Sequence, residues 1–343
     1  MKKLLNILFV TLPDVIVSLD TENVCVKKDG EVLLNVPLLN LEGIVLFNYF
    51  GATPQLLGEC AKRDITVSFL NEYGKFLGSF YGESRGNVLL RKEQYRISDN
   101  PVKSLEYAKN FIFGKLHNQK WVVERGLRDY ALRVDTDLLK KGSLQITENM
   151  KQTLDCDDVD LLRAIEGNTA QSYFRAFDEL ILKNKDGFTF TNRNRRPPTD
   201  PVNAMLSFAY TLLVSECRHA LECVGLDSYA GFMHTERPGR PSLALDLMEE
   251  LRPHFADRFV LSLINRNEIT PSDFKTQESG AVLLSDEARK NFLSAWQQRK
   301  KETINHPFLK EKLEWGIVPH VQALLLSRTI RGDLEQYPPF LWK

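Results

Sequence analysis

The sequence has no long hydrophobic run and no cysteine pattern that would predict a disulfide or zinc framework. Of its 343 residues 43% are hydrophobic, yet no stretch approaches the roughly 18 uninterrupted apolar residues of a membrane span. Its five cysteines are scattered and include no Cys-x-x-Cys pair, which argues against both a disulfide-stapled secreted domain and a zinc ribbon. We therefore expect a soluble protein of the reducing cytoplasm with no membrane partner.

An excess of positive charge is also missing. The 45 Lys and Arg residues balance 45 Asp and Glu residues, so the formal net charge is zero. Proteins that coat long stretches of nucleic acid usually accumulate basic residues, because their binding depends on phosphate contacts. Two basic runs, residues 183–196 and 289–301, could make a local contact, although each also fits a solvated loop or helix face. Any contact with DNA should therefore be local.

Residues 1–82 predict a β-rich, sandwich-like domain, because short apolar runs alternate there with turn residues. Asp29-Gly30 lies between two such runs and is a strong hairpin signal, since glycine tolerates the positive φ of that turn. A Thr-Pro pair at 53–54 predicts one helix among the strands. The runs that we expect to form strands centre on residues 15–17, 24–26, 32–34, 44–46 and 65–69.

Residues 88–343 predict a larger all-α domain, separated from the first by a short linker at 83–87. Apolar residues recur three and four positions apart over residues 89–139, 161–181 and 202–221. The aromatic and proline-rich end, residues 337–342, is expected to pack on its own or a neighbouring subunit. The fold class is therefore α+β, with a β-rich domain followed by an α-helical one.

The residues most indicative of chemistry follow a histidine. His234 precedes a loop rich in Pro, Gly and Arg, after which a helix should begin near Ser242. Asp246, Glu249 and Glu250 are spaced i, i+3 and i+4 on that helix, which predicts three carboxylates on one side. Taken singly, the histidine fits an ordinary hydrogen-bonded side chain and the acids fit a solvated face. Together they suit a metal beside a negatively charged substrate.

Glu166 is a third candidate, in an acid-Gly-Asn-Thr sequence near the start of an apolar-periodic helix. Without the region around His234 it would be interpreted as a helix-terminal acid near the positive end of the helix dipole. Cys217, His219 and Cys223 are not expected to bind zinc, because residues two apart on a helix face different directions.

Three separated motifs resemble the CRISPR-associated spacer-acquisition integrase family, in the family's order and across the whole chain. They are Glu166-Gly-Asn-Thr-Ala-Gln-Ser-Tyr173-Phe174, then Arg195-Arg-Pro-Pro-Thr-Asp200-Pro-Val-Asn203-Ala-Met-Leu-Ser207-Phe208, and Gly231-Phe-Met-His234 followed by Leu245-Asp246-Leu-Met-Glu249. By this resemblance Glu166, His234 and Glu249 would hold a divalent metal and form the catalytic site. Asp246 would be a supporting or alternative ligand, and Glu250 is a less secure candidate. Carboxylates and one imidazole suit Mg²⁺ or Mn²⁺.

The resemblance also implies an activity and partners. A 3′-hydroxyl of a short captured duplex would attack a phosphodiester at the edge of a CRISPR repeat, and the same site could reverse that reaction on branched DNA or hydrolyse DNA. The family forms homodimers through its β-rich domains, bridged by a small second adaptation subunit. A RecB-like adaptation exonuclease is a further expected partner.

Several arginines are candidate DNA contacts, because guanidinium offers paired donors to phosphate oxygens. Arg237 and Arg240 flank the histidine loop and lead this set, with Arg252 a weaker candidate. Arg193, Arg195 and Arg196 lie just before the Pro-x-Asp-Pro-Val-Asn loop of the second motif and are expected along the DNA path. The remaining polar residues of these motifs, namely Asp200, Asn203 and Tyr173, are expected to be structural, and Trp296 of the second basic run to be packed.

Two other functions fit the same residues. A general nuclease for branched DNA would need the same metal site without joining anything. A DNA-binding scaffold would carry these residues without using them. Joined product in a strand-transfer assay separates integration from both.

Overall fold

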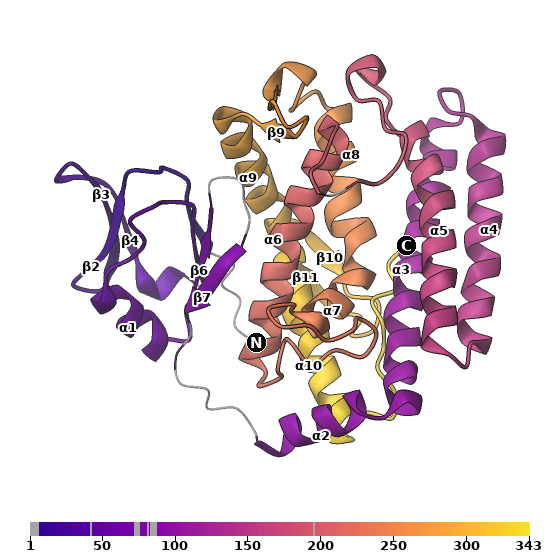
Figure 1. Ribbon diagram of the computed structural model, residues 1–343, viewed down its shortest axis with the longest axis horizontal. Coiled ribbons are helices and arrows are strands. Elements are labelled where there is room, and N and C mark those ends of the chain that lie inside the picture. The colour runs from indigo at the N-terminus through magenta and orange to yellow at the C-terminus, as the bar shows by residue number, and fades with distance from the viewer. Residues whose placement is uncertain (1–6, 42, 72–75, 81, 83–87, 195) are drawn as a thin grey trace. The chain divides into compact units, whose positions relative to one another are not determined.

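The structure is a computed structural model that describes every residue except 1–6, 42, 72–75, 81, 83–87 and 195 (Figure 1). The chain divides into two compact units. The β-rich unit holds residues 1–85 and 293–301, and the helical unit holds residues 86–292 and 302–343. The predicted linker at 83–87 lies outside the described residues, and the boundaries at 82 and 88 remain predictions. Nothing among the described helices is long and apolar enough to cross a membrane.

Up to residue 80 the described part of the β-rich unit contains two sheets and one helix, and residues 293–301 add the C-terminal part of a further helix, α9 (Asp286–Lys301). One sheet has the order β1-β5-β6-β7, in which β1, β5 and β6 are parallel and β7 pairs antiparallel with β6. The other is the antiparallel meander β2-β3-β4. Their bounds are β1 Ile7–Val10, β2 Ile16–Asp20, β3 Asn23–Lys28, β4 Glu31–Pro37, β5 Gly43–Leu46, α1 Pro54–Lys62, β6 Thr66–Leu70 and β7 Phe76–Phe80.

The predicted turn and helix of this unit are confirmed. Asp29 and Gly30 have φ of 50° and 87°, and they join β3 to β4 directly, as a tight hairpin with two positive φ values requires. Helix α1 begins at Pro54, as predicted, although its N-cap Thr53 makes no side-chain cap bond. One apolar core joins residues of both sheets and of α1, which include Val17, Val26, Ile44, Leu56 and Val67.

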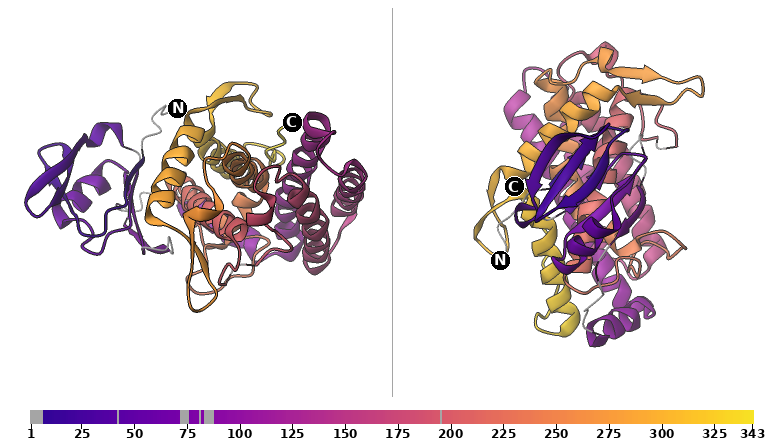
Figure 2. Two further views of the ribbon diagram at one scale, coloured as in Figure 1. Left: turned by 90° about the horizontal axis from the view of Figure 1, so that it is seen from above. Right: turned by 90° about the vertical axis from the view of Figure 1, so that its left-hand side faces the viewer.

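The helical unit is a bundle in which α3, α4 and α5 run side by side (Figures 1 and 2). Side chains of Asn100, Asp135, Asp158 and Asp200 cap the first N–H groups of α3, α4, α5 and α6, donors that would otherwise lack partners. The helices are α2 Val88–Ser98, α3 Pro101–Tyr130, α4 Thr136–Asp155, α5 Val159–Glu179, α6 Pro201–Cys223, α7 Ser242–Arg252, α8 Arg258–Asn265, α9 Asp286–Lys301 and α10 Val318–Arg331.

A π-helix, Pro253–Asp257, joins α7 to α8. Two short hairpins that the periodicity did not predict also lie in the helical unit, β8 (Phe274–Thr276) with β9 (Val282–Leu284), and β10 (Thr303–Asn305) with β11 (Lys312–Glu314). The expected class, strands first and a mostly helical region after them, is confirmed. Runs of three residues are too short to show a strand periodicity in the sequence.

Candidate metal centre

The loop before α7 is bound to the helix through Asp246. Its buried carboxylate accepts hydrogen bonds from three successive backbone N–H groups, with donor–acceptor distances of 2.6 Å for Phe232, 3.0 Å for Met233 and 3.0 Å for His234. Gly231 makes this close approach possible, because an added Cβ would lie 2.7 Å from the Ser242 Cβ and 2.9 Å from an oxygen of Asp246. The loop conformation is therefore tied to one carboxylate of α7.

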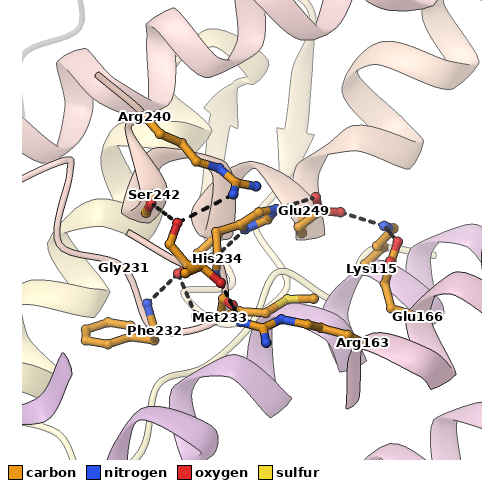
Figure 3. A network of polar contacts seen from close by, with 12 residues as sticks. Lys115, Arg163, Glu166, Gly231, Phe232, Met233, His234, Arg240, Ser242 and Glu249 are labelled. Atoms are coloured by element: carbon orange, nitrogen blue, oxygen red, sulfur yellow. Dashed lines mark hydrogen bonds and ion pairs between the residues drawn. The ribbon is translucent and has the colours of Figure 1, made fainter. Parts of the chain in front are cut away.

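Asp246 also orients the imidazole of His234. The Nδ1 atom of His234 lies 2.6 Å from Asp246 Oδ1. Because an ionised carboxylate can only accept, this contact favours the neutral tautomer that has its hydrogen on Nδ1 and its lone pair on Nε2. Nε2 lies 3.9 Å from Oε1 of Glu249, and Figure 3 shows the ring directed toward that carboxylate. This carboxylate–histidine pair is the usual support of a metal-binding imidazole.

Glu249 is buried between two cations. Arg252 Nη1 lies 2.5 Å from its Oε1, and Lys115 Nζ lies 2.6 Å from its Oε2. Burial alone would raise the pKa of Glu249, but Arg252 and Lys115 hold that pKa well below its usual range. Glu249 is therefore ionised at neutral pH and available as an anionic ligand.

Glu166 lies in the interior of α5, not at its end as a capping acid would, and its carboxylate pairs with the same ammonium of Lys115. Lys115 comes from α3, so three helices meet at this point (Figure 3). Lys115 was not among the residues predicted for the site. The sequence does place this lysine on the apolar face of the helix, four residues after Phe111 and three after Ile112, which are both fully buried. That position would have indicated a buried lysine.

Glu250 does not join the cluster, so the expectation that all three acids of α7 point to one side was wrong. Its buried carboxylate accepts hydrogen bonds from the Tyr337 hydroxyl at 2.5 Å, the Gln322 amide at 2.8 Å and the Phe340 N–H at 2.8 Å. Adjacent helical residues are about 100° apart around the axis, which is enough to turn Glu250 toward the C-terminal segment while Glu249 faces α3 and α5. The C-terminal segment thus packs on its own subunit, one of the two predicted alternatives.

Arg252 was the weaker candidate for a DNA contact. It is buried, and its guanidinium donates a hydrogen bond to Glu249. Its guanidinium lies 4.1 Å from the centre of the Tyr210 ring, and the Tyr210 and Tyr173 hydroxyls both donate to Asp257, at 2.5 Å and 2.9 Å. Burial raises the pKa of Tyr173 well above its usual value. Tyr173 is thus a buried structural residue of this network, as the sequence indicated.

Arginines surround the histidine loop. Arg237 is exposed, and Arg240 is half-buried with its guanidinium 3.4 Å from the Thr235 carbonyl. Partial burial and then the nearby Arg237 lower the pKa of Arg240, with smaller contributions from Arg163 and Arg196. Arg163, which the sequence analysis did not single out, donates to the Met233 carbonyl at 2.6 Å. Asp246 acts in the opposite direction on the pKa of Arg240, so the loop of His234 has arginines on its outer side and a carboxylate beneath it.

The three arginines before the Pro-x-Asp-Pro-Val-Asn loop differ from one another. Arg196 is exposed, and Arg195 lies outside the described residues. Arg193 instead donates to Asn203 Oδ1 at 2.5 Å and Ser207 Oγ at 3.0 Å on α6, so its guanidinium supports the loop structurally. Asp200 caps α6 as expected, accepting from the Asn203 N–H at 2.8 Å. Of the remaining structural predictions, Trp296 is buried as expected.

Glu166, His234 and Glu249 are residue types that bind divalent cations, and one buried oxygen of Glu249 could serve as a ligand. In the described part of the chain, no three His, Cys, Asp or Glu side chains form a ready metal cluster, and Glu166 and Glu249 meet through Lys115. Oε2 of Glu249 is nevertheless buried without a hydrogen-bond partner of good geometry. Two carboxylates and one imidazole are a donor set that suits Mg²⁺ or Mn²⁺. Cys217 is buried and Cys223 is exposed on the same helix, where Cys223 Sγ lies 3.5 Å from His219 Nε2.

Known proteins are similar in sequence to this chain over its full length. The model of the family described as CRISPR associated protein Cas1 matches residues 8–298. The CRISPR-associated endonuclease Cas1 1 of Chlorobaculum tepidum is 46% identical over 343 residues, covering all of both chains. A CRISPR-associated exonuclease Cas4/endonuclease Cas1 fusion of Geobacter sulfurreducens is 36% identical, over 97% of this chain and 60% of the fusion.

Solved structures share the fold at low sequence identity. A casposase bound to integration product superimposes with a TM-score of 0.83 at 22% identity, covering 98% of this chain and 94% of the casposase. A Cas1 protein from Thermotoga maritima gives 0.81 at 22% identity, covering 95% and 97%. A chain of a Cas6-RT-Cas1–Cas2 complex gives 0.81 at 23% identity, covering 98% of this chain and 36% of the other.

Proposed function

This chain belongs to the CRISPR-associated Cas1 family, and from that premise we propose that Glu166, His234 and Glu249 are the metal ligands of its DNA-joining site. The chain is an endonuclease and integrase of CRISPR adaptation. The observation that carries the site assignment is the convergence of two buried or partly buried acids and an oriented imidazole, from α5, α7 and the loop before α7.

The proposed reaction joins a short captured duplex to a CRISPR repeat. A 3′-hydroxyl attacks a phosphodiester at the repeat edge, forming a new phosphodiester bond and releasing the old 3′-oxygen, and a second attack on the other strand completes insertion. Bound Mg²⁺ or Mn²⁺ would stabilise the negative charge that develops on the attacking and leaving oxygens. The site of action that we propose is the cytoplasm, where such DNA is found.

The protein's own residues supply orientation and charge. Asp246 acts behind His234 and not as a direct ligand, because its carboxylate already accepts four hydrogen bonds. Arg252 fixes the rotamer of Glu249. Arg237 and Arg240 are the proposed phosphate contacts beside the metal, and Arg163 supports the loop between them. Arg196, with Arg195, would extend the DNA path, and Arg193 would hold that loop on α6.

The partners that we propose are suggested by the zero net charge of the chain and by the exposed apolar residues of β4. Because the net charge is zero, one subunit alone should attract a long duplex only weakly. We therefore expect a duplex to be held by several subunits. Strand β4 exposes Val32, Leu33 and Leu34 at 56%, 48% and 42%, which suits a homodimer through the β-rich units. A small second adaptation subunit and a RecB-like exonuclease are the other proposed partners. The Geobacter fusion and the Cas1–Cas2 complex support them.

The test is strand transfer of a labelled short duplex into a supercoiled plasmid that bears a CRISPR repeat. We expect metal-dependent joined product with the second subunit present, abolished by Glu166→Ala, His234→Ala or Glu249→Ala. Asp137→Ala is the control, since its carboxylate is exposed on α4. Free cleavage without joined product would favour the branched-DNA nuclease, and joining that survives the three substitutions would refute the site.

A further inference from the structure

Lys115 is a buried lysine between the two acidic residues of the proposed metal centre. It is 5% exposed, and its one ammonium pairs with Glu166 on α5 and with Glu249 on α7. Figure 3 shows its side chain reaching from α3 into the gap between these carboxylates. A lysine is seldom buried unless it is paired, so this contact accounts for its position.

The ammonium and a divalent cation would need the same oxygens. Lys115 Nζ lies 2.6 Å from Glu249 Oε2, whereas Mg²⁺ binds carboxylate oxygens at about 2.1 Å. Both cations cannot lie between the same two carboxylates at these distances. Oε2 of Glu249 has no other hydrogen-bond donor of good geometry, so it is the oxygen that would exchange one cation for the other.

The charges of the cluster lead to the same exchange. Glu166, Glu249 and Asp246 are three carboxylates, and Lys115 and Arg252 are two cations, so this set has one negative charge in excess. A divalent cation added to the set turns this into one positive charge in excess in a mostly buried space, whereas displacement of the ammonium leaves the set neutral. A phosphodiester brought by DNA would offset part of this excess.

We infer that Lys115 is an exchangeable counter-ion of the metal centre, whose ammonium holds the position between Glu166 and Glu249 and is displaced from it when a divalent cation binds. The inference rests on the proposed metal site and adds a residue that sets its affinity. Lys115 thus competes with the metal for the carboxylates of Glu166 and Glu249.

The carboxylates do not depend on Lys115 alone for their place. Arg252 binds the other oxygen of Glu249 at 2.5 Å, and Glu166 lies in the interior of the long helix α5. Removing the amine should therefore remove a competing charge while the ligands stay near each other. A purely structural lysine would have the opposite effect, because its loss would weaken metal binding.

The experiment is titration calorimetry of Mn²⁺ into the full chain after chelator treatment, with Lys115→Met compared with the unsubstituted protein. We expect Lys115→Met to bind Mn²⁺ at least about tenfold more tightly. Its thermal midpoint should be lower without Mn²⁺, because the buried Glu249 and the partly exposed Glu166 then lose their shared counter-ion, and should rise more on Mn²⁺ addition. Lys103→Met is the matched control, since that lysine is exposed on the same helix, and its affinity should be unchanged.

Unchanged or weaker Mn²⁺ binding by Lys115→Met would overturn the inference and leave the proposed metal site standing. No Mn²⁺ binding by the unsubstituted protein would overturn both. If Lys115→Met does not fold, the same Mn²⁺ titration of Lys115→Arg tests the inference, because a guanidinium keeps the competing charge. Its affinity should stay within about threefold of the unsubstituted protein, and a larger increase would contradict competition by charge.

Discussion

At the scale of single residues, Asp246 determines what His234 can do. Its carboxylate accepts from three backbone N–H groups and from His234 Nδ1. The same residue therefore builds the loop and selects the tautomer that presents Nε2. Two functions on one carboxylate make it sensitive to the loss of a single oxygen.

We predict that Asp246→Asn weakens Mn²⁺ binding by about 10- to 100-fold, because a carboxylate that orients a metal-binding imidazole contributes that much to metal affinity. An amide replaces one acceptor by a donor that faces N–H groups, so stability should also fall by about 1 to 3 kcal/mol. Calorimetry of Mn²⁺ binding and urea unfolding measure the two effects. The control is Asp137→Asn at an exposed position, and equal behaviour of both variants would contradict this role for Asp246.

Glu250 predicts a dependence of stability on pH. Burial raises its pKa to about 7 from an ordinary value of 4.5, against the hydrogen bonds of Tyr337, Gln322 and Phe340, which lower it. Between these values the folded state binds a proton that the unfolded state has lost. This contribution is present in full below about pH 4.5 and is lost as the pH rises through 7, an effect of up to about 3 kcal/mol.

Glu250→Gln removes this titration. From about pH 5 to about pH 8 the free energy of unfolding should fall less in Glu250→Gln than in the unsubstituted protein. Urea unfolding at both pH values measures it, with Glu236→Gln as an exposed control. The same decrease in both proteins would show that Glu250 is not the group responsible.

At the scale of elements, the loop from Gly231 to His234 and helix α7 fold as one piece. The first N–H groups of α7 lack a side-chain cap, and Leu243 and Ala244 donate instead to the Ser228 carbonyl, at 3.0 Å and 3.3 Å. The helix start is therefore completed by the same segment that leads into the metal loop. A disturbance at Gly231 should reach the site directly.

Gly231→Ala should be destabilising by about 1 to 3 kcal/mol, because its Cβ would meet Ser242 and Asp246 at under 3.0 Å. Metal binding should weaken with it, since Asp246 must shift. Thermal unfolding and Mn²⁺ calorimetry measure these effects. Gly58→Ala provides the control, as a Cβ there meets nothing within 4 Å. A stable Gly231→Ala with normal Mn²⁺ affinity would contradict the close packing.

The sequence predicted the elements better than the directions of their side chains. Period and turn residues were enough for α1, the Asp29-Gly30 hairpin and the cap of α6. They could not show that Glu250 turns away from Glu249, because its partners Gln322 and Tyr337 are more than 70 residues further along the chain. Lys115 was missed for the same reason, since its partners come from α5 and α7.

At the scale of the whole molecule, the exposed apolar side chains of β4 are the basis of the proposed homodimer. We predict that Leu33→Glu on β4 converts the proposed homodimer to a monomer, because a buried unpaired charge opposes association. Light scattering with size-exclusion chromatography measures the mass. Leu144→Glu, at an exposed position of α4, should leave it unchanged. A dimer that persists in Leu33→Glu would exclude β4 from the interface.

The central claim is that His234 and two acids bind one divalent cation, and electron spin echo spectroscopy of bound Mn²⁺ tests it most directly. A coordinated imidazole nitrogen modulates the Mn²⁺ echo, so we predict a nitrogen coupling in the unsubstituted protein that persists in His219→Ala and disappears in His234→Ala. Glu166→Gln and Glu249→Gln should each weaken Mn²⁺ binding. Bound Mn²⁺ without a nitrogen coupling, or a coupling that survives His234→Ala, would contradict the proposed site.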